Sequence, residues 1–122
     1  MKLLCVSKLP KEIIDAPLFT GGKIERQTIV SEQESKNFNA SIIHFAPGAR
    51  NKWHIHDCDQ LLITTKGQGI IATEEEGELS MQEGDVAYIP AGQKHWHGTT
   101  QNSSFAHITI TVPHSKLTQM EA

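Results

Sequence analysis

Hydrophobic and polar residues alternate in short runs along this chain, and turn-forming residues separate the runs. Alternation with a period of two is typical of strands that bury one face, and the chain lacks a convincing amphipathic helix. The expected strands cover residues 23–30, 38–45, 60–65, 70–73, 78–81, 85–89, 95–99 and 105–112, with a turn at residues 66–69. Short strands at such regular spacing predict an all-β fold with one domain, either a barrel or a sandwich.

The last expected strand carries two rows of different character. Its polar row holds Phe105, His107, Thr109 and Thr111, and its apolar row holds Ala106, Ile108, Ile110 and Val112. Successive side chains of a strand point to opposite faces, so only one row faces the interior. If the polar row lines an internal cavity, the apolar row faces outward and needs a second sheet or a second subunit to cover it.

The two ends of the chain differ from the expected barrel, which we assign to residues 23–113. Residues 1–22 contain two prolines and predict an extended arm with at most one helical turn, and residues 114–122 form a polar tail. The arm carries four large apolar residues that need burial: Ile13, Ile14, Leu18 and Phe19. A partner subunit offers them a place, and we therefore expect a homodimer or a higher homo-oligomer.

Composition narrows the classes of partner. The chain has 122 residues, a formal charge of −3 and no basic cluster, which argues against a nucleic-acid partner. Its apolar runs are too short to span a membrane. The first residues lack the apolar region and cleavage site of a signal peptide, so we expect a cytoplasmic protein whose cysteines, Cys5 and Cys58, stay reduced.

Candidate metal chemistry lies in two segments. His54 and His56 are two residues apart in an extended stretch, so their imidazoles project to the same side. Neutral imidazole is a good ligand for divalent transition metals. In the second segment, Pro90 and Gly92 predict a tight bend that aims His95 back across the barrel.

Both segments resemble the two conserved motifs of cupins. The first reads Gly48, five residues, His54-x-His56, three residues, Gln60, six residues and Gly67. The second reads Gly84, five residues, Pro90-x-Gly92, two residues, His95, three residues and Thr99. The resemblance implies a jelly-roll-like β-barrel with one divalent metal held by His54, His56, Gln60 and His95. Gln60 stands where cupins usually have glutamate, and Thr99 stands where they have asparagine.

Gln60 changes the expected electrostatics of that site. An amide ligand cancels no metal charge, so the ion is a stronger Lewis acid and is held less tightly than with glutamate. The alternative is that Gln60 marks a cupin without metal, but three histidines inside an apolar barrel would then lack partners. Nitrogen and oxygen ligands suit manganese, our first choice, and then iron, zinc, nickel or cobalt.

Within the cupins, the chain resembles small single-domain proteins similar to carboxymuconolactone-decarboxylase-associated cupins and to manganese-dependent hydroxynitrile lyases. The lyases also use three histidines and a glutamine as ligands. Their pocket histidines correspond to His97, which shares a strand face with His95, and to His107. This chain has Asn51 in place of a pocket threonine and Thr111 in place of a pocket glutamine, and both departures alter hydrogen-bond donors near the substrate.

The resemblance implies a lyase or another Lewis-acid enzyme that acts on a small hydroxylated or carbonyl substrate. His107 or His97 would move the proton, unless His107 faces solvent instead of the cavity. One alternative is an iron- or manganese-dependent dioxygenase, and another is a non-catalytic module that binds a metal or a sugar.

Overall fold

A computed structural model describes residues 1–122, and almost all of its regular structure is strand. The elements in chain order are η1 (Val6–Lys8), β1 (Glu12–Ile13), β2 (Phe19–Thr20), β3 (Ile24–Val30), β4 (Asn39–Phe45), β5 (Arg50–Asn51), β6 (His54–His56), β7 (Gln60–Thr73), β8 (Gly77–Gln82), β9 (Val86–Ile89), β10 (His95–Gly98), β11 (Phe105–Thr111) and β12 (Leu117–Gln119). The all-β prediction is confirmed. The structure contains no helix that is long and apolar enough to cross a membrane.

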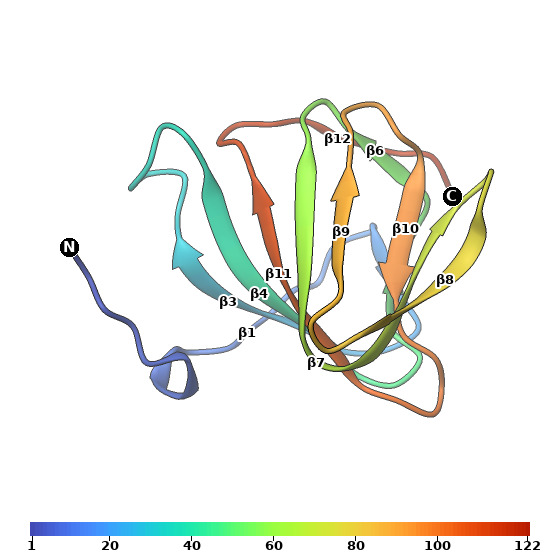
Figure 1. Ribbon diagram of the computed structural model, residues 1–122, viewed down its shortest axis with the longest axis horizontal. Coiled ribbons are helices and arrows are strands. Elements are labelled where there is room, and N and C mark those ends of the chain that lie inside the picture. The colour runs from blue at the N-terminus through green and yellow to red at the C-terminus, as the bar shows by residue number, and fades with distance from the viewer.

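Two curved sheets share the long strand β7. In the first sheet the order is β1-β3-β4-β11-β7-β9, and in the second β7 pairs with β8 and with β10, which continues to β5 and β2. All the pairings are antiparallel. The strands curl around a common interior that opens at one end (Figure 1). The strand spacing left a barrel or a sandwich open, and the structure is the barrel that the resemblance implied.

The prediction of a turn at residues 66–69 is wrong, because strand β7 runs through these residues without interruption. The glycines there bend one strand from the first sheet into the second. Gly67 has a φ of 72°, and the register with β11 shifts between Ala106 and His107. The ring of Phe105 occupies the space that a side chain at Gly69 would need. A bulge and a small residue are what a strand requires to turn a barrel corner.

The hydrophobic core fills the closed part of the barrel. Ile24, Phe45, Leu62 and Phe105 are each at most 2% exposed. The rings of Phe45 and Phe105 stack with their centroids 5.6 Å apart. The histidines border this core, since the rings of Phe45 and His107 are 5.4 Å apart.

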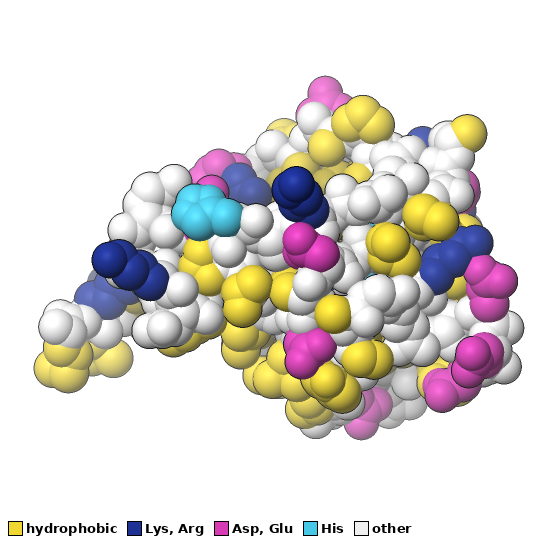
Figure 2. All heavy atoms as spheres, turned by 90° about the horizontal axis from the view of Figure 1, so that it is seen from above, with side chains coloured by type: hydrophobic (Ala, Val, Ile, Leu, Met, Phe, Trp, Pro, Cys, Tyr) yellow, Lys and Arg dark blue, Asp and Glu magenta, His cyan; other side chains and the backbone are white.

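The arm and the tail both add short strands to the barrel. β1 pairs with β3, β2 pairs with β5, and β12 pairs with β6. Ile14 and Phe19 pack against the core of their own chain, whereas Ile13 is 68% exposed. The first residues project from the body as a lobe that carries hydrophobic and basic side chains (Figures 1 and 2). Packing of the arm on a partner subunit stays a prediction.

The polar row of β11 faces the interior of the barrel, and its apolar row faces outward. His107 is fully buried, and Ile108 and Ile110 are partly exposed. Cross-strand pairing places Ile108 between Ile63 of β7 and Ile42 of β4, and Ile63 pairs with Val86 of β9. We call this row, Val86–Ile63–Ile108–Ile42, the apolar stripe. Val86 at one end is 59% exposed, whereas Ile42 at the other end is 4% exposed and is already covered by its own chain.

Candidate metal centre

Three histidines of the two motifs meet where β6 and β10 pair. His54 lies directly opposite His95 in the antiparallel register. The ring centroids of His54 and His95 are 4.3 Å apart, those of His54 and His56 are 5.0 Å apart, and those of His56 and His95 are 5.7 Å apart. The structure therefore brings the motif histidines together, as their spacing predicted.

Backbone carbonyls fix the tautomers of two of these rings. The Nδ1 atom of His54 is 2.6 Å from the carbonyl oxygen of Lys52, and the Nδ1 atom of His95 is 2.9 Å from that of Gln93. A carbonyl oxygen only accepts, so both Nδ1 atoms carry the proton and both Nε2 atoms hold a lone pair. The Nε2 atom of His56 is buried without any hydrogen-bond partner.

Gln60, the first residue of β7, directs its amide oxygen at the same place. Its Nε2 atom donates to Oγ1 of Thr109 at 2.9 Å, and its Oε1 atom lies 3.1 Å from Nε2 of His95. Both facing atoms hold lone pairs, because the proton of His95 is on Nδ1. Two acceptors at hydrogen-bond distance repel each other unless a cation lies between or beside them.

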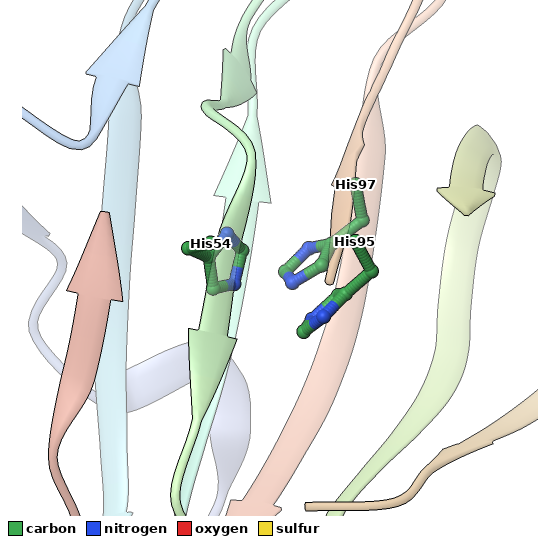
Figure 3. Close-up of side chains that lie close together, drawn as sticks. All are labelled: His54, His95 and His97. Atoms are coloured by element: carbon green, nitrogen blue, oxygen red, sulfur yellow. The ribbon is translucent and has the colours of Figure 1, made fainter. Parts of the chain in front are cut away.

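His97, predicted as a pocket histidine, also reaches this cluster. The nitrogens available from His54, His95 and His97 all lie within 4.8 Å of one another. His95 and His97 come from β10, and their rings extend toward His54 (Figure 3). Such a cluster suggests a divalent metal site.

Hydrogen bonding separates His97 from the other histidines. Asn51 Nδ2 lies 3.1 Å from its Nε2 atom and 3.3 Å from its Nδ1 atom, and His107 Nε2 lies 3.1 Å from its Nδ1 atom. His97 therefore has polar contacts within the protein on its ring. The atoms without a donor are instead Nε2 of His54, His56 and His95 and Oε1 of Gln60. These nitrogen and oxygen donors would suit a divalent transition metal.

Burial keeps these histidines neutral. It lowers the pKa of His54 to about 3, that of His56 to about 4 and that of His107 to about 3. The neighbouring His95 lowers the pKa of His54 and His56 further. The pKa of His97 lies well below its usual value for the same main reason, burial. A neutral ring keeps the lone pair that a metal or a substrate proton requires.

The candidate site opens into a cavity of about 180 Å³. Its polar wall includes His97, His107, Asn51 and both threonines of the last strand that were assigned to the polar row, Thr109 and Thr111. Its apolar wall is formed by Leu18, Phe19, Ile43, Phe45 and Leu117. The alternative that His107 faces solvent is thus excluded, and the prediction that it faces the cavity is the one that agrees with the structure. The volume is below that of a site for drug-sized ligands and suits a small molecule.

A larger hollow of about 390 Å³ between β8 and β9 lies away from the histidines.

The fold and the candidate site define a cupin, and comparison with known proteins agrees. The cupin domain family matches residues 41–111, more than half of the chain, so this protein belongs to the cupin family. It is similar to an (R)-mandelonitrile lyase from Granulicella tundricola, with 38% identity over 68 residues. That match covers 56% of this chain and 52% of the lyase, so the chain spans about half the length of its curated relative.

Solved structures show the same fold. A cupin-like protein from Thermotoga maritima is 27% identical, with a TM-score of 0.82 over 90% of this chain and 84% of that protein. The polyketide cyclase RemF from Streptomyces resistomycificus has a TM-score of 0.89 over all of this chain and 87% of the cyclase, at 14% identity. At that identity the cyclase shows likeness of fold alone.

Two residues of the candidate site have roles that the sequence did not reveal. Thr109 holds the amide of Gln60, and Asn51 contacts His97. The alternation of the last strand already placed Thr109 beside His107 on the polar row. Asn51 was identified only as a departure from a pocket threonine, because its partner is 46 residues away in the sequence.

Proposed function

We propose that this protein is a metal-dependent cupin lyase for a small hydroxylated or carbonyl substrate, with cyanohydrin cleavage as an accessible reaction. One divalent metal, manganese first, would be held by His54, His56, His95 and Gln60. The observation that carries the proposal is the pair of facing acceptors, Gln60 Oε1 and His95 Nε2, at 3.1 Å. With the amide in this orientation and Nδ1 of His95 donating to Gln93, a cation makes that contact favourable.

This set of ligands suits a metal that acts as a Lewis acid better than it suits high-affinity metal binding. When bound, a divalent cation at three imidazoles and an amide supplies Lewis-acid polarisation of a substrate oxygen. The neutral set leaves the full charge of the ion in place. The cavity walls of Phe19, Phe45 and Leu117 are apolar and suit an apolar substituent.

The histidine pair next to the cavity would move the proton. In cyanohydrin cleavage the hydroxyl loses its proton, the bond between the carbinol carbon and the nitrile carbon breaks, and a carbonyl group forms. Cyanide leaves with the electron pair of the broken bond and takes up the proton. His97 and His107 line the cavity and are 3.1 Å apart, so one can accept the proton while the other shares the resulting charge.

Similarity to the mandelonitrile lyase supports this choice of reaction. Because the match covers about half of that enzyme, the reaction is a proposal for this chain. The test is release of benzaldehyde from mandelonitrile by protein loaded with manganese. We expect wild type and His114→Ala to be active, because His114 is exposed on the tail, and His54→Ala and His107→Ala to be strongly impaired.

The same preparation separates the alternatives. No metal-dependent release of benzaldehyde would refute the lyase. Oxygen consumption with phenols or thiols after iron loading would support a dioxygenase instead. Binding of metal with neither activity would indicate a non-catalytic module.

We also infer that the protein acts as a homo-oligomer in the cytoplasm. The apolar stripe ends at Val86, which is 59% exposed, and the arm exposes Leu3 and Val6. Both surfaces belong to the same chain, and a two-fold arrangement would cover both in each subunit. Exposed Lys8 on the arm and exposed Asp85 beside Val86 have opposite charges, which favours a second copy over an unrelated partner.

A further inference from the structure

The C-terminal tail forms one side of the cavity. Its strand β12 pairs with β6, and both strands lie at the open end of the barrel (Figure 1). In that pairing Leu117 lies directly opposite His56. Opposite residues of an antiparallel pair project to the same face, so Leu117 points with His56 into the cavity that both residues line. Leu117 is 40% exposed, which places it at the mouth of the cavity.

Much of the apolar wall lies outside the part of the chain that matches the cupin family. The match covers residues 41–111, whereas Leu18 and Phe19 belong to the arm and Leu117 belongs to the tail. The barrel supplies the histidines of the site. The two ends of the chain therefore supply most of the wall that faces an apolar substituent.

Hydrogen bonds fasten the tail on both sides of Leu117, over residues 116–121, which we call the C-terminal strap. At its start the backbone nitrogen of Lys116 donates to Oδ1 of Asp57 at 2.8 Å. The backbone nitrogen of Asp57 donates in return to the carbonyl oxygen of Lys116 at 3.0 Å. Near the end of the strap the backbone nitrogen of Met120 donates to the carbonyl oxygen of Trp53 at 2.7 Å.

Glu121 locks the end of the strap with both of its carboxylate oxygens. Oε2 pairs with Nη2 of Arg50 at 2.7 Å, and Oε1 accepts from the backbone nitrogen of Trp53 at 3.0 Å. Arg50 is itself held, because its guanidinium lies over the ring of Trp96, 5.0 Å from the centroid. Hydrogen bonds to an ionised group are stronger than those between neutral groups, so Glu121 is the strongest single restraint on the strap.

We propose that Leu117 is a specificity-determining residue that limits the size of the apolar substituent of the substrate, and that Glu121 is a positioning residue that keeps Leu117 at the mouth. An apolar cavity of about 150 Å³ holds benzene. The cavity of about 180 Å³ here therefore accommodates one six-membered ring with a small polar group, and a second fused ring would meet Leu117. The substrate class is a hydroxyl or carbonyl compound with a single ring, and its conversion rests on the proposed function.

Binding of two alcohols to the metal-free protein tests the size limit without turnover. In ligand-observed NMR titrations we expect wild type to bind benzyl alcohol about 10-fold more tightly than 2-naphthalenemethanol. Leu117→Ala should remove this preference, a change of the size expected when contacts in an apolar pocket are altered. Leu117→Phe should weaken the binding of benzyl alcohol itself. Thr118→Ala is the matched control, because Thr118 lies on the opposite face of the same strand and is exposed, and it should keep the wild-type preference.

Hydrogen exchange at the amide of Met120 separates the lock from the wall, because this amide is bonded only while the strap is closed. Glu121→Ala should accelerate the exchange and should shift the preference in the same direction as Leu117→Ala. Leu117→Ala should leave the exchange at the wild-type rate. Glu121→Gln keeps an acceptor for the backbone nitrogen of Trp53 but loses the charge that faces Arg50, so its exchange rate should lie between those of wild type and Glu121→Ala.

Equal binding of the two alcohols by wild type, or an unchanged preference in Leu117→Ala, would overturn the role of Leu117. If Leu117→Ala does not fold, Leu117→Val decides by the same preference. An unchanged preference or an unchanged Met120 exchange rate in Glu121→Ala would overturn the role of Glu121. The expected preference in a protein that does not cleave mandelonitrile would refute the proposed function and leave the size limit standing.

Discussion

The Oε1 atom of Gln60 faces the Nε2 atom of His95 at 3.1 Å, and each is held there by a hydrogen bond on its far side. Thr109 holds the amide nitrogen of Gln60, and the carbonyl of Gln93 holds Nδ1 of His95. Both restraints leave lone pairs directed at each other. An arrangement that is unfavourable without a cation and favourable with one is the physical basis for placing a metal here.

Replacing Gln60 by glutamate should separate metal affinity from reactivity. The carboxylate adds one negative charge beside the ion, and it can still contact Thr109, as an acceptor from the hydroxyl. We expect the metal to bind about 10-fold more tightly or better, equivalent to roughly 1.4 kcal/mol, and the lyase rate to fall. Competition with a chelator measures the affinity, and benzaldehyde release measures the rate. An affinity equal to that of wild type would show that residue 60 is not a ligand.

Thr109 should act on the metal through Gln60. Thr109→Val keeps the shape of the side chain but removes the acceptor for Nε2 of Gln60, so the amide is free to turn its nitrogen toward His95. We expect metal affinity to fall about 10-fold to 100-fold, the usual effect of losing a residue that orients a ligand. Thr109→Ser is the matched control, since it keeps the hydroxyl and should bind like wild type. Equal losses in both variants would assign the effect to packing.

The stability of the metal-free protein should fall with acid below pH 6.5. The pKa of His107 is about 3 in the folded state and 6.5 is its ordinary value, so between these values only the unfolded chain binds the proton. His54 and His56 behave alike, with folded pKa values of about 3 and about 4. The fully buried His107 adds a loss of about 1.4 kcal/mol per pH unit from pH 6.5 down to its folded pKa and none above pH 6.5, and His54 and His56 add losses in the same direction.

Urea unfolding at several pH values measures this dependence. His107→Gln should reduce the slope by the share of one histidine, and His114→Gln, changed on the exposed tail, is its control. A free energy of unfolding that is the same at pH 5 and pH 7 would contradict the burial of neutral histidines.

The apolar stripe should govern assembly. Val86→Glu places a charge at its exposed end without disturbing the core, because the side chain is 59% exposed. We expect light scattering to report an oligomer for wild type and a smaller species for this variant. Met120→Glu, at a residue 49% exposed on the tail, should keep the wild-type mass. A monomeric wild type would refute the inferred assembly.

Much of the fold could be predicted because local alternation determines strands in a barrel. The expected strands other than those in β7 agree with the structure to within one residue at each end. The prediction divided β7 into two strands because glycines at residues 67 and 69 give the same sequence signal for a turn and for a bulge. Only the pairing of β7 with β8, β10 and β11 distinguishes these two cases.

The candidate site could be predicted where its residues lie close together in the sequence, within one of the two motifs. His54, His56 and His95 meet because β6 and β10 pair, and the motifs encode that pairing. The contacts of Asn51 with His97 and of Gln60 with Thr109 join residues 46 and 49 positions apart. Their orientation depends on which atom of each amide finds a donor or an acceptor, and a sequence does not specify this.

Anomalous diffraction from crystals loaded with manganese tests the central claim most directly. We expect one peak per chain within about 2.3 Å of Nε2 of His54, His56 and His95 and of Oε1 of Gln60, the usual range for such ligands. His97 should remain bound to Asn51 and His107. A peak coordinated by His97 instead of His56, or crystals that take up no metal at this position, would contradict the assignment.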